Sequence, residues 1–131
     1  MKKGGILNPA IMSALAGIGH TEYLVIADSG LPLPAGVEVI DLSLTKGVPS
    51  FLQVLEAVQQ EFVIESYVLA KEMPEKSNPL YLQTVETLAE LPRRLVSHEE
   101  FKKLLGSAYA IIRTGEATPY ANVILVGGVD F

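Results

Sequence analysis

The chain has 131 residues, no cysteine and a formal net charge of −5 at pH 7, which favours a single domain and excludes disulfide frameworks, thiol nucleophiles, zinc fingers and iron–sulfur clusters. Its acidic pI near 5.0 argues against a nucleic-acid partner, because binding to a phosphate backbone requires a basic surface. Apolar residues make up 49% of the chain and charged residues only 19%, against about 25% charged in a typical soluble domain, and we interpret this excess as subunit interface.

The N-terminal segment places two lysines before an apolar stretch, which loosely imitates a signal peptide. Asn8 and Pro9 interrupt that pattern and instead indicate a helix, with Asn8 as the N-cap and Pro9 at the first helical position. Gly17 or Gly19 is expected to end this helix in the left-handed conformation. No apolar run approaches the roughly 18 to 20 residues needed to cross a bilayer. We therefore expect a cytoplasmic protein without a membrane partner, with secretion as a minor alternative.

From residue 23 onward, predicted strands and helices alternate. Residues 23–27 form a continuous apolar run, typical of a strand buried on both faces, and the glycine- and proline-rich residues 29–36 form a loop. Further strands are predicted at 37–42, 61–70, 93–96, 108–113 and 123–126, and further helices at 51–58, 78–91 and 97–105. This alternation predicts an α/β fold: a single layered α/β/α domain over residues 1–131 with a mostly parallel central sheet.

Two of these helices begin with capping signals. Asn78 precedes Pro79 and repeats the arrangement at the N-terminus, so Asn78 is expected to cap its helix. Ser97 and Glu100 form a capping-box pattern, in which the serine accepts a hydrogen bond from the third helical N–H and the glutamate reaches back to the cap.

The ends of the strands indicate where function should lie, because ligands of open α/β sheets bind outside the carboxyl ends of the strands. Asp28 ends the first strand, and His98 immediately follows another. Asp28 has a simpler interpretation as well, since an aspartate there can bracket its loop by accepting backbone hydrogen bonds. His98 and Lys102 are four positions apart and share one helix face. That face is either solvated or presents two donors to sugar or carboxylate oxygens.

His20 and the segment from Arg113 to Asn122 are the other candidates. His20 lies in a turn, flanked by Gly19 and Thr21, and is either a solvent-exposed turn residue or a catalytic one. The polar segment 113–122 suits a polyol ligand, or is only a crossover loop. A dinucleotide fingerprint, a Walker A motif and a serine-hydrolase elbow are absent. A metal site formed by His20, Asp28 and His98 is a further alternative, although nothing in their spacing requires it.

Taken together, these motifs resemble a known family. They comprise the segment 19–32, Asn8, the pair His98 and Lys102, the segment 113–116 and the segment 119–122. The chain resembles, over essentially its whole length, the D-ribose pyranases, whose wider family includes the L-fucose mutarotases. In the latter the residues after the aspartate differ, and glycine tends to stand at the position of Ala121.

The resemblance implies an isomerase that interconverts the pyranose and furanose rings of D-ribose, and so supports ribose uptake and catabolism by supplying the furanose to ribokinase. It implies that His20 is the catalytic acid and that Asp28, His98, Tyr120 and Asn122 bind the sugar, with Lys102 nearby. It further implies a homodecamer of two stacked pentamers with sites between subunits. We expect the loop 119–122 to meet the His20 and Asp28 region of a neighbouring subunit.

The chemistry needs no cofactor or metal, because opening a cyclic hemiacetal requires only proton transfers. An imidazole with an ordinary pKa of about 6.5 can give and take protons near neutrality. Asp28 either orients His20 or binds a sugar hydroxyl. Two alternatives remain: a non-catalytic sugar-binding or regulatory module, and a mutarotase for another monosaccharide.

Overall fold

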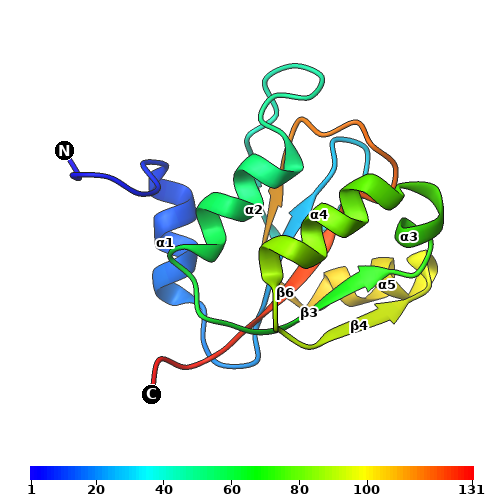
Figure 1. Cartoon of the computed structure of the whole chain (residues 1–131). Helices are drawn as coiled ribbons and strands as arrows, with labels where there is room; N and C mark the ends of the chain where they lie inside the picture. Colours follow the sequence, from blue (N-terminus) through cyan, green and yellow to red (C-terminus); the bar gives the residue numbers. More distant parts are fainter.

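A six-stranded sheet organises the chain in the computed structural model, which describes all 131 residues (Figure 1). The strand order is β2-β5-β1-β6-β3-β4. The strands are β1 (Tyr23–Ala27), β2 (Glu38–Asp41), β3 (Ile64–Ala70), β4 (Arg93–Val96), β5 (Ala108–Arg113) and β6 (Val123–Gly127). The pairs β1–β5, β2–β5 and β3–β4 are parallel, whereas β6 is antiparallel to both of its neighbours. The predicted α/β class with a mostly parallel sheet is confirmed.

Helices cover both faces of this sheet. They are α1 (Pro9–Gly17), α2 (Phe51–Gln59), α3 (Met73–Lys76), α4 (Asn78–Leu88), α5 (His98–Leu104) and the 3₁₀ helix η1 (Leu105–Ser107). α1, α2 and α4 lie on the near face of Figure 1, where a core cluster of 19 buried residues forms, and α5 lies behind the sheet over a second cluster of 8. No helix has the length and apolar character needed to span a membrane.

Strand β1 shows why its sequence is a continuous apolar run. Leu24 and Ile26 pack in the larger core, whereas Val25 and Ala27 pack in the smaller one, and all four are fully buried. Side chains alternate between the two faces of a strand, so a strand covered on both sides needs apolar residues at every position. The prediction for residues 23–27 therefore matches β1 at both ends.

Helix α4 departs from its prediction at both ends. Its N-cap is Ser77 and not Asn78, which is the first helical residue, and the Ser77 hydroxyl donates instead to the carbonyl of Pro119 at 2.5 Å. The helix ends at Leu88 because Ala89 adopts a positive φ of 46°. The short helix α3 before it was not predicted.

Two other local predictions need adjustment. β3 begins at Ile64, later than expected, because the Glu61 N–H donates to Val58 at the end of α2. The Ser97 hydroxyl does accept from the Glu100 N–H at 3.1 Å, but Glu100 makes no hydrogen bond back to the cap. The complete capping box is instead at α2, between Ser50 and Gln53.

Candidate active site

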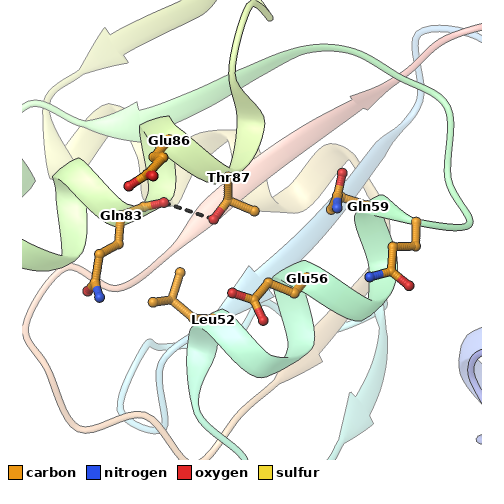
Figure 2. Close-up of a pocket in the computed structure, with 7 residues that line it drawn as sticks. Leu52, Glu56, Gln59, Gln83, Glu86 and Thr87 are labelled. Carbon is orange, nitrogen blue, oxygen red and sulfur yellow. Dashed lines mark hydrogen bonds between the residues drawn. The ribbon is translucent and has the colours of Figure 1, made fainter.

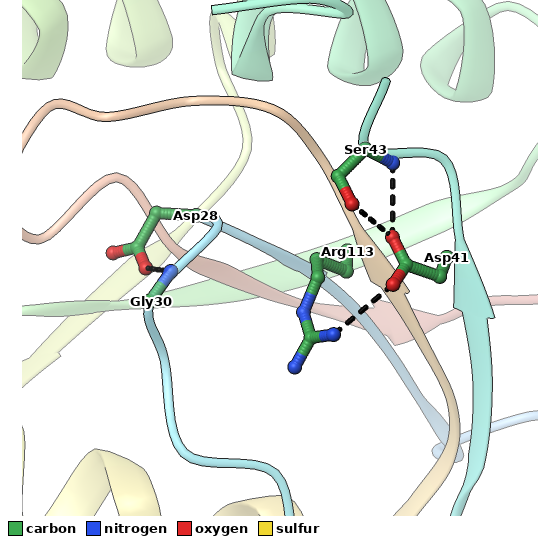
Figure 3. A network of polar contacts seen from close by, with 5 residues as sticks. All are labelled: Asp28, Gly30, Asp41, Ser43 and Arg113. Atoms are coloured by element: carbon green, nitrogen blue, oxygen red, sulfur yellow. Dashed lines mark hydrogen bonds and ion pairs between the residues drawn. The ribbon is translucent and has the colours of Figure 1, made fainter. Parts of the chain in front are cut away.

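Asp28 and Asn122 meet at the carboxyl edge of the sheet. Asp28 directly follows β1 and Asn122 directly precedes β6, which runs the opposite way, so the two residues are neighbours. Asn122 is fully buried; its Nδ2 donates to Asp28 Oδ2 at 3.0 Å and its Oδ1 accepts from the Asp28 N–H at 2.8 Å. Asp28 Oδ1 also accepts from the Gly30 N–H at 2.9 Å (Figure 3). The carboxylate thus brackets its loop and faces a buried amide.

His98 and Tyr120 lie at the same edge. His98 opens α5 just after the carboxyl end of β4, and its ring meets that of Tyr120 edge-on, with 5.1 Å between the ring centroids. Both carboxylate oxygens of Glu72 accept from the His98 N–H at 3.1 Å, which fixes the helix start. His98 Nδ1 is buried without a hydrogen-bond partner. Tyr120 holds a positive φ of 62°, a conformation that is costly for a bulky residue and that is found most often at functional sites.

Lys102 lies on α5 with His98 but has a partner of its own. Its Nζ is 2.8 Å from Glu99 Oε1, and the hydrogen bond from Lys102 holds the pKa of the Glu99 carboxyl below its usual value. The Glu99 side chain is 78% exposed, whereas that of Lys102 is 32% exposed. The ammonium is therefore held near the site by an exposed carboxylate.

His20 lies at the opposite end of the strands, just before the amino end of β1. It precedes β1, in a turn where Thr21, and neither Gly17 nor Gly19, has the left-handed conformation, with a φ of 70°. Gly17 is the last residue of α1, but the expected left-handed conformation is wrong, because the C-cap residue Ile18 is extended. His20 Nε2 is 2.7 Å from Glu65 Oε2, near the start of β3.

The length of β1 separates His20 from the other candidates within one chain. Five residues of extended strand span about 16 Å, and Asp28 is at the far end. Asp28 therefore does not orient His20 of its own chain, and the expectation that these two residues form one region is corrected: Asp28 belongs with Asn122. For the same reason, His20, Asp28 and His98 do not converge on a metal site within a chain.

An Asp41–Arg113 pair was missed by the sequence analysis. Asp41 ends β2 and Arg113 ends β5, and Arg113 Nη1 lies 3.0 Å from Asp41 Oδ2 (Figure 3). Ser43 donates to Asp41 through its hydroxyl and its N–H, and these bonds, followed by Arg113, lower the pKa of Asp41. Arg113 belonged to the candidate segment 113–122, and the rule that singled out Asp28 would have added Asp41, the last residue of β2 at the carboxyl edge.

The candidate residues do not line the surface hollows of the single chain, although their neighbours Thr21, Ser29 and Pro119 do. A groove of about 500 Å³ between α2 and α4 is lined by glutamate and glutamine side chains, with Thr87 and Leu52 (Figure 2). Five hollows of about 330 to 530 Å³ mark the surface, and none of them is lined by His20, Asp28, His98, Lys102, Tyr120 or Asn122. The candidate residues thus form two open half-sites. One is His20, before the amino end of β1, and the other, at the carboxyl ends of the parallel strands, comprises Asp28, His98, Lys102, Tyr120 and Asn122.

Comparisons with known proteins agree over the full length. The family model described as the RbsD / FucU transport protein family matches residues 1–130. The D-ribose pyranase of Exiguobacterium sibiricum is 53% identical over 100% of both chains, and that of Geobacillus thermodenitrificans is 50% identical over 100% of this chain and 99% of the relative. The structure of Bacillus subtilis RbsD complexed with D-ribose superposes with a TM-score of 0.97 at 45% identity, covering 100% of each chain. On this evidence the chain belongs to the RbsD / FucU transport protein family.

Proposed function

We propose that the chain interconverts the pyranose and furanose forms of D-ribose by acid–base opening and closure of the ring, in support of ribose uptake and phosphorylation. The observation that carries this proposal is the full-length match, with a TM-score of 0.97, to a relative bound to D-ribose. Identities of 50% or more to D-ribose pyranases over the whole chain favour the same substrate and reaction.

The reaction consists of two proton transfers around a breaking carbon–oxygen bond. The anomeric hydroxyl loses its proton, the bond between C1 and the ring oxygen breaks with its electron pair on that oxygen, and the ring oxygen takes up a proton. Closure onto the other hydroxyl reverses these steps. His20 is the proposed proton-transfer group, since an imidazole can act in both directions near neutral pH.

The residues of the carboxyl edge supply the sugar-binding groups. Asp28 offers a carboxylate to sugar hydroxyls, and Lys102 and the His98 ring supply donors. Tyr120 offers an aromatic ring, which His98 meets edge-on. Asn122 is buried beneath these groups and holds Asp28 in place through two hydrogen bonds.

A complete site requires a second subunit. His20 is 51% exposed within one chain, so its ring faces water until another surface covers it. We place His20 of the partner subunit against the carboxyl edge that holds Asp28, Tyr120 and Asn122. Closed rings satisfy such a head-to-tail contact for every copy, and a decamer of two stacked pentamers is the assembly that we propose. Exposed apolar side chains such as Val39, Leu95 and Tyr109 offer surface for such contacts.

Exchange spectroscopy by NMR on D-ribose, with and without the protein, tests the reaction. Catalysis predicts faster exchange between pyranose and furanose signals in proportion to protein concentration. A sugar-binding module without turnover would leave the exchange at its uncatalysed rate. Acceleration for another monosaccharide but not for ribose would instead identify a mutarotase with a different substrate.

A further inference from the structure

The contact between His20 and Glu65 goes beyond the residues assigned above. Glu65 Oε2 is 2.7 Å from His20 Nε2, and both side chains are partly exposed, at 44% and 51%. The residues are 45 positions apart in the chain, so the contact is made by the fold and not by local sequence. Glu65 is the only carboxylate within ion-pair distance of His20 in the chain.

The backbone of β3 is irregular at Glu65. Ile64 pairs with Gly127 and Ser66 pairs with Val126, so Glu65 lies opposite no residue of β6. An extra residue of this kind forms a β-bulge, which turns a side chain away from the regular alternation and is common beside active sites. Gly128 leaves room for it, because an added Cβ there would come within 3.2 Å of the Glu65 Cβ.

The turn that carries His20 is fixed from both sides. Glu22 Oε2 accepts from the Gly19 N–H at 2.6 Å, and the Glu22 N–H donates to the Gly19 carbonyl at 3.2 Å. Thr21 and Glu22 are joined to Gly127 by two backbone hydrogen bonds of 2.8 Å each. The ring of His20 is therefore held between an anchored turn and a bulged strand, which is the arrangement needed to fix one ring orientation.

The chemistry of the two groups decides which nitrogen carries the proton. An ionised carboxylate accepts hydrogen bonds but has no proton to donate, and a neutral imidazole has one donor and one acceptor nitrogen. His20 must therefore donate through Nε2 to Glu65. Its Nδ1 is then left as the unprotonated nitrogen of the neutral ring.

We infer that Glu65 is a positioning residue that holds His20 in the Nε2–H tautomer, so that Nδ1 is the atom that exchanges protons with the sugar. The inference rests on the proposed catalytic role of His20. Nε2 keeps its proton on the Glu65 hydrogen bond throughout the reaction, while Nδ1 takes the proton of the anomeric hydroxyl and gives one back. Partner carboxylates fix the tautomer and orientation of reactive histidines in this way.

The tautomer can be measured directly, because the chain has only two histidines. Protein labelled with ¹⁵N-histidine, in its assembled form, gives ring-nitrogen shifts that distinguish a protonated from a bare nitrogen, and His98→Gln assigns the remaining signal to His20. We expect neutral His20 to be protonated at Nε2 in the parent. Protonation at Nδ1 in the parent overturns the inference.

The kinetic test compares two glutamate-to-glutamine substitutions. Glu65→Gln keeps the shape of the side chain but can donate as well as accept, so it removes the tautomer preference; we expect mixed tautomers and a fall in kcat of about 10-fold or more with KM unchanged. Glu38→Gln is the matched control, since it removes the same charge from an exposed position at the start of β2, and it is expected to leave both constants as in the parent. Glu65→Gln with the parent's tautomer and kcat overturns the inference, as does an equal loss in the control.

Failure of the proposed function gives a different result. If His20→Ala exchanges ribose at the parent's rate, the catalytic role of His20 is wrong, and the positioning role of Glu65 falls with it even where the Nε2–H tautomer is observed. If His20→Ala is inactive and Glu65→Gln is fully active, only the inference about Glu65 is wrong.

Discussion

Asn122 and Asp28 lie 94 positions apart and exchange two hydrogen bonds, from the Asn122 amide to the Asp28 carboxylate and from the Asp28 N–H to the Asn122 carbonyl oxygen. One fully buried side chain thus fixes both the backbone and the carboxylate of the residue that ends β1. A buried amide with both of its polar groups in use is costly to disturb, so the carboxyl-edge half of the site is rigid before any ligand arrives.

His20→Ala should abolish the exchange of ribose ring forms while leaving the fold and the assembly intact. Loss of a general acid–base group typically lowers the rate by about 10²- to 10⁴-fold, and an exposed turn residue contributes little to the core. NMR exchange rates, read beside circular dichroism and sedimentation, check both parts. Exchange at the parent's rate would remove His20 from the mechanism.

Asp28→Asn should weaken ribose binding, because it preserves shape but removes the charge that faces sugar hydroxyls. We expect KM to rise, with a fall in kcat if the partner subunit's ring is oriented through the sugar. Exposed Glu56 on α2 serves as the control, since Glu56→Gln removes a charge from the groove between α2 and α4, which none of the candidate site residues lines. Unchanged affinity and rate in Asp28→Asn would leave Asp28 with its loop-bracketing role alone.

Asp41→Asn should destabilise the chain near neutral pH and not in acid. Hydrogen bonds from Ser43, with Arg113, hold the pKa of Asp41 below its ordinary value of 3.8, so its stabilisation is present above pH 3.8 and is lost as the pH falls through the folded-state pKa. The side chain is 44% exposed, so the loss at neutral pH should be about 1 kcal/mol or less. Urea unfolding of parent and variant should show a difference in the free energy of unfolding at pH 7 that closes as the pH falls below the lowered pKa of Asp41 in the folded state. A difference that persists in acid would contradict this origin.

Chelation followed by prolonged dialysis should leave ribose exchange unchanged, because the proposed reaction needs only proton transfer. The measurement is the exchange rate before and after treatment, with metal content followed in parallel. Lasting loss of activity that a divalent ion restores would instead favour a metal held by His20, Asp28 and His98 across a subunit interface.

Mixed assemblies test whether sites are shared between subunits. His20→Ala and His98→Ala damage opposite edges of the sheet, so each should be inactive alone. Co-expressed in one assembly, they should restore about a quarter of the parent's sites, since some interfaces then join an intact His20 to an intact carboxyl edge. Mixed assemblies as inactive as either variant, or a stable monomer with full activity per chain on dilution, would contradict a shared site.

Elements whose local sequence pattern agrees with their burial match their predicted bounds. β1 was predicted at both ends because a strand covered on both faces shows an unbroken apolar run. The cap of α4 was misplaced because Asn78 matches the preferred residue types, whereas the register is set by the contact of Ser77 with Pro119, far away in the chain. Propensity is a weak guide where a tertiary contact decides.

The candidate site was predictable in part for the same reason. Asp28 and His98 were singled out by the rule on strand ends, and the topology places both just after the carboxyl ends of their strands. The position of His20 before β1 was sufficient to predict that it lies at the other end of the strand from Asp28. The prediction of a joint His20 and Asp28 region came from the family resemblance instead. Glu65 carried no signal in the sequence, because the bulge that points it toward His20 arises from the pairing of β3 with β6.

The reversed direction of β6 gives each subunit a polarity. Asn122 immediately precedes the first residue of β6, and Gly127, which anchors the turn of His20, is its last residue. A single buried strand therefore spans from one half-site to the other and sets the distance between them. In a closed ring the His20 half-site of each subunit meets the carboxyl-edge half-site of its neighbour, so there are as many complete sites as subunits. An open row of subunits leaves one unmatched half-site at each end.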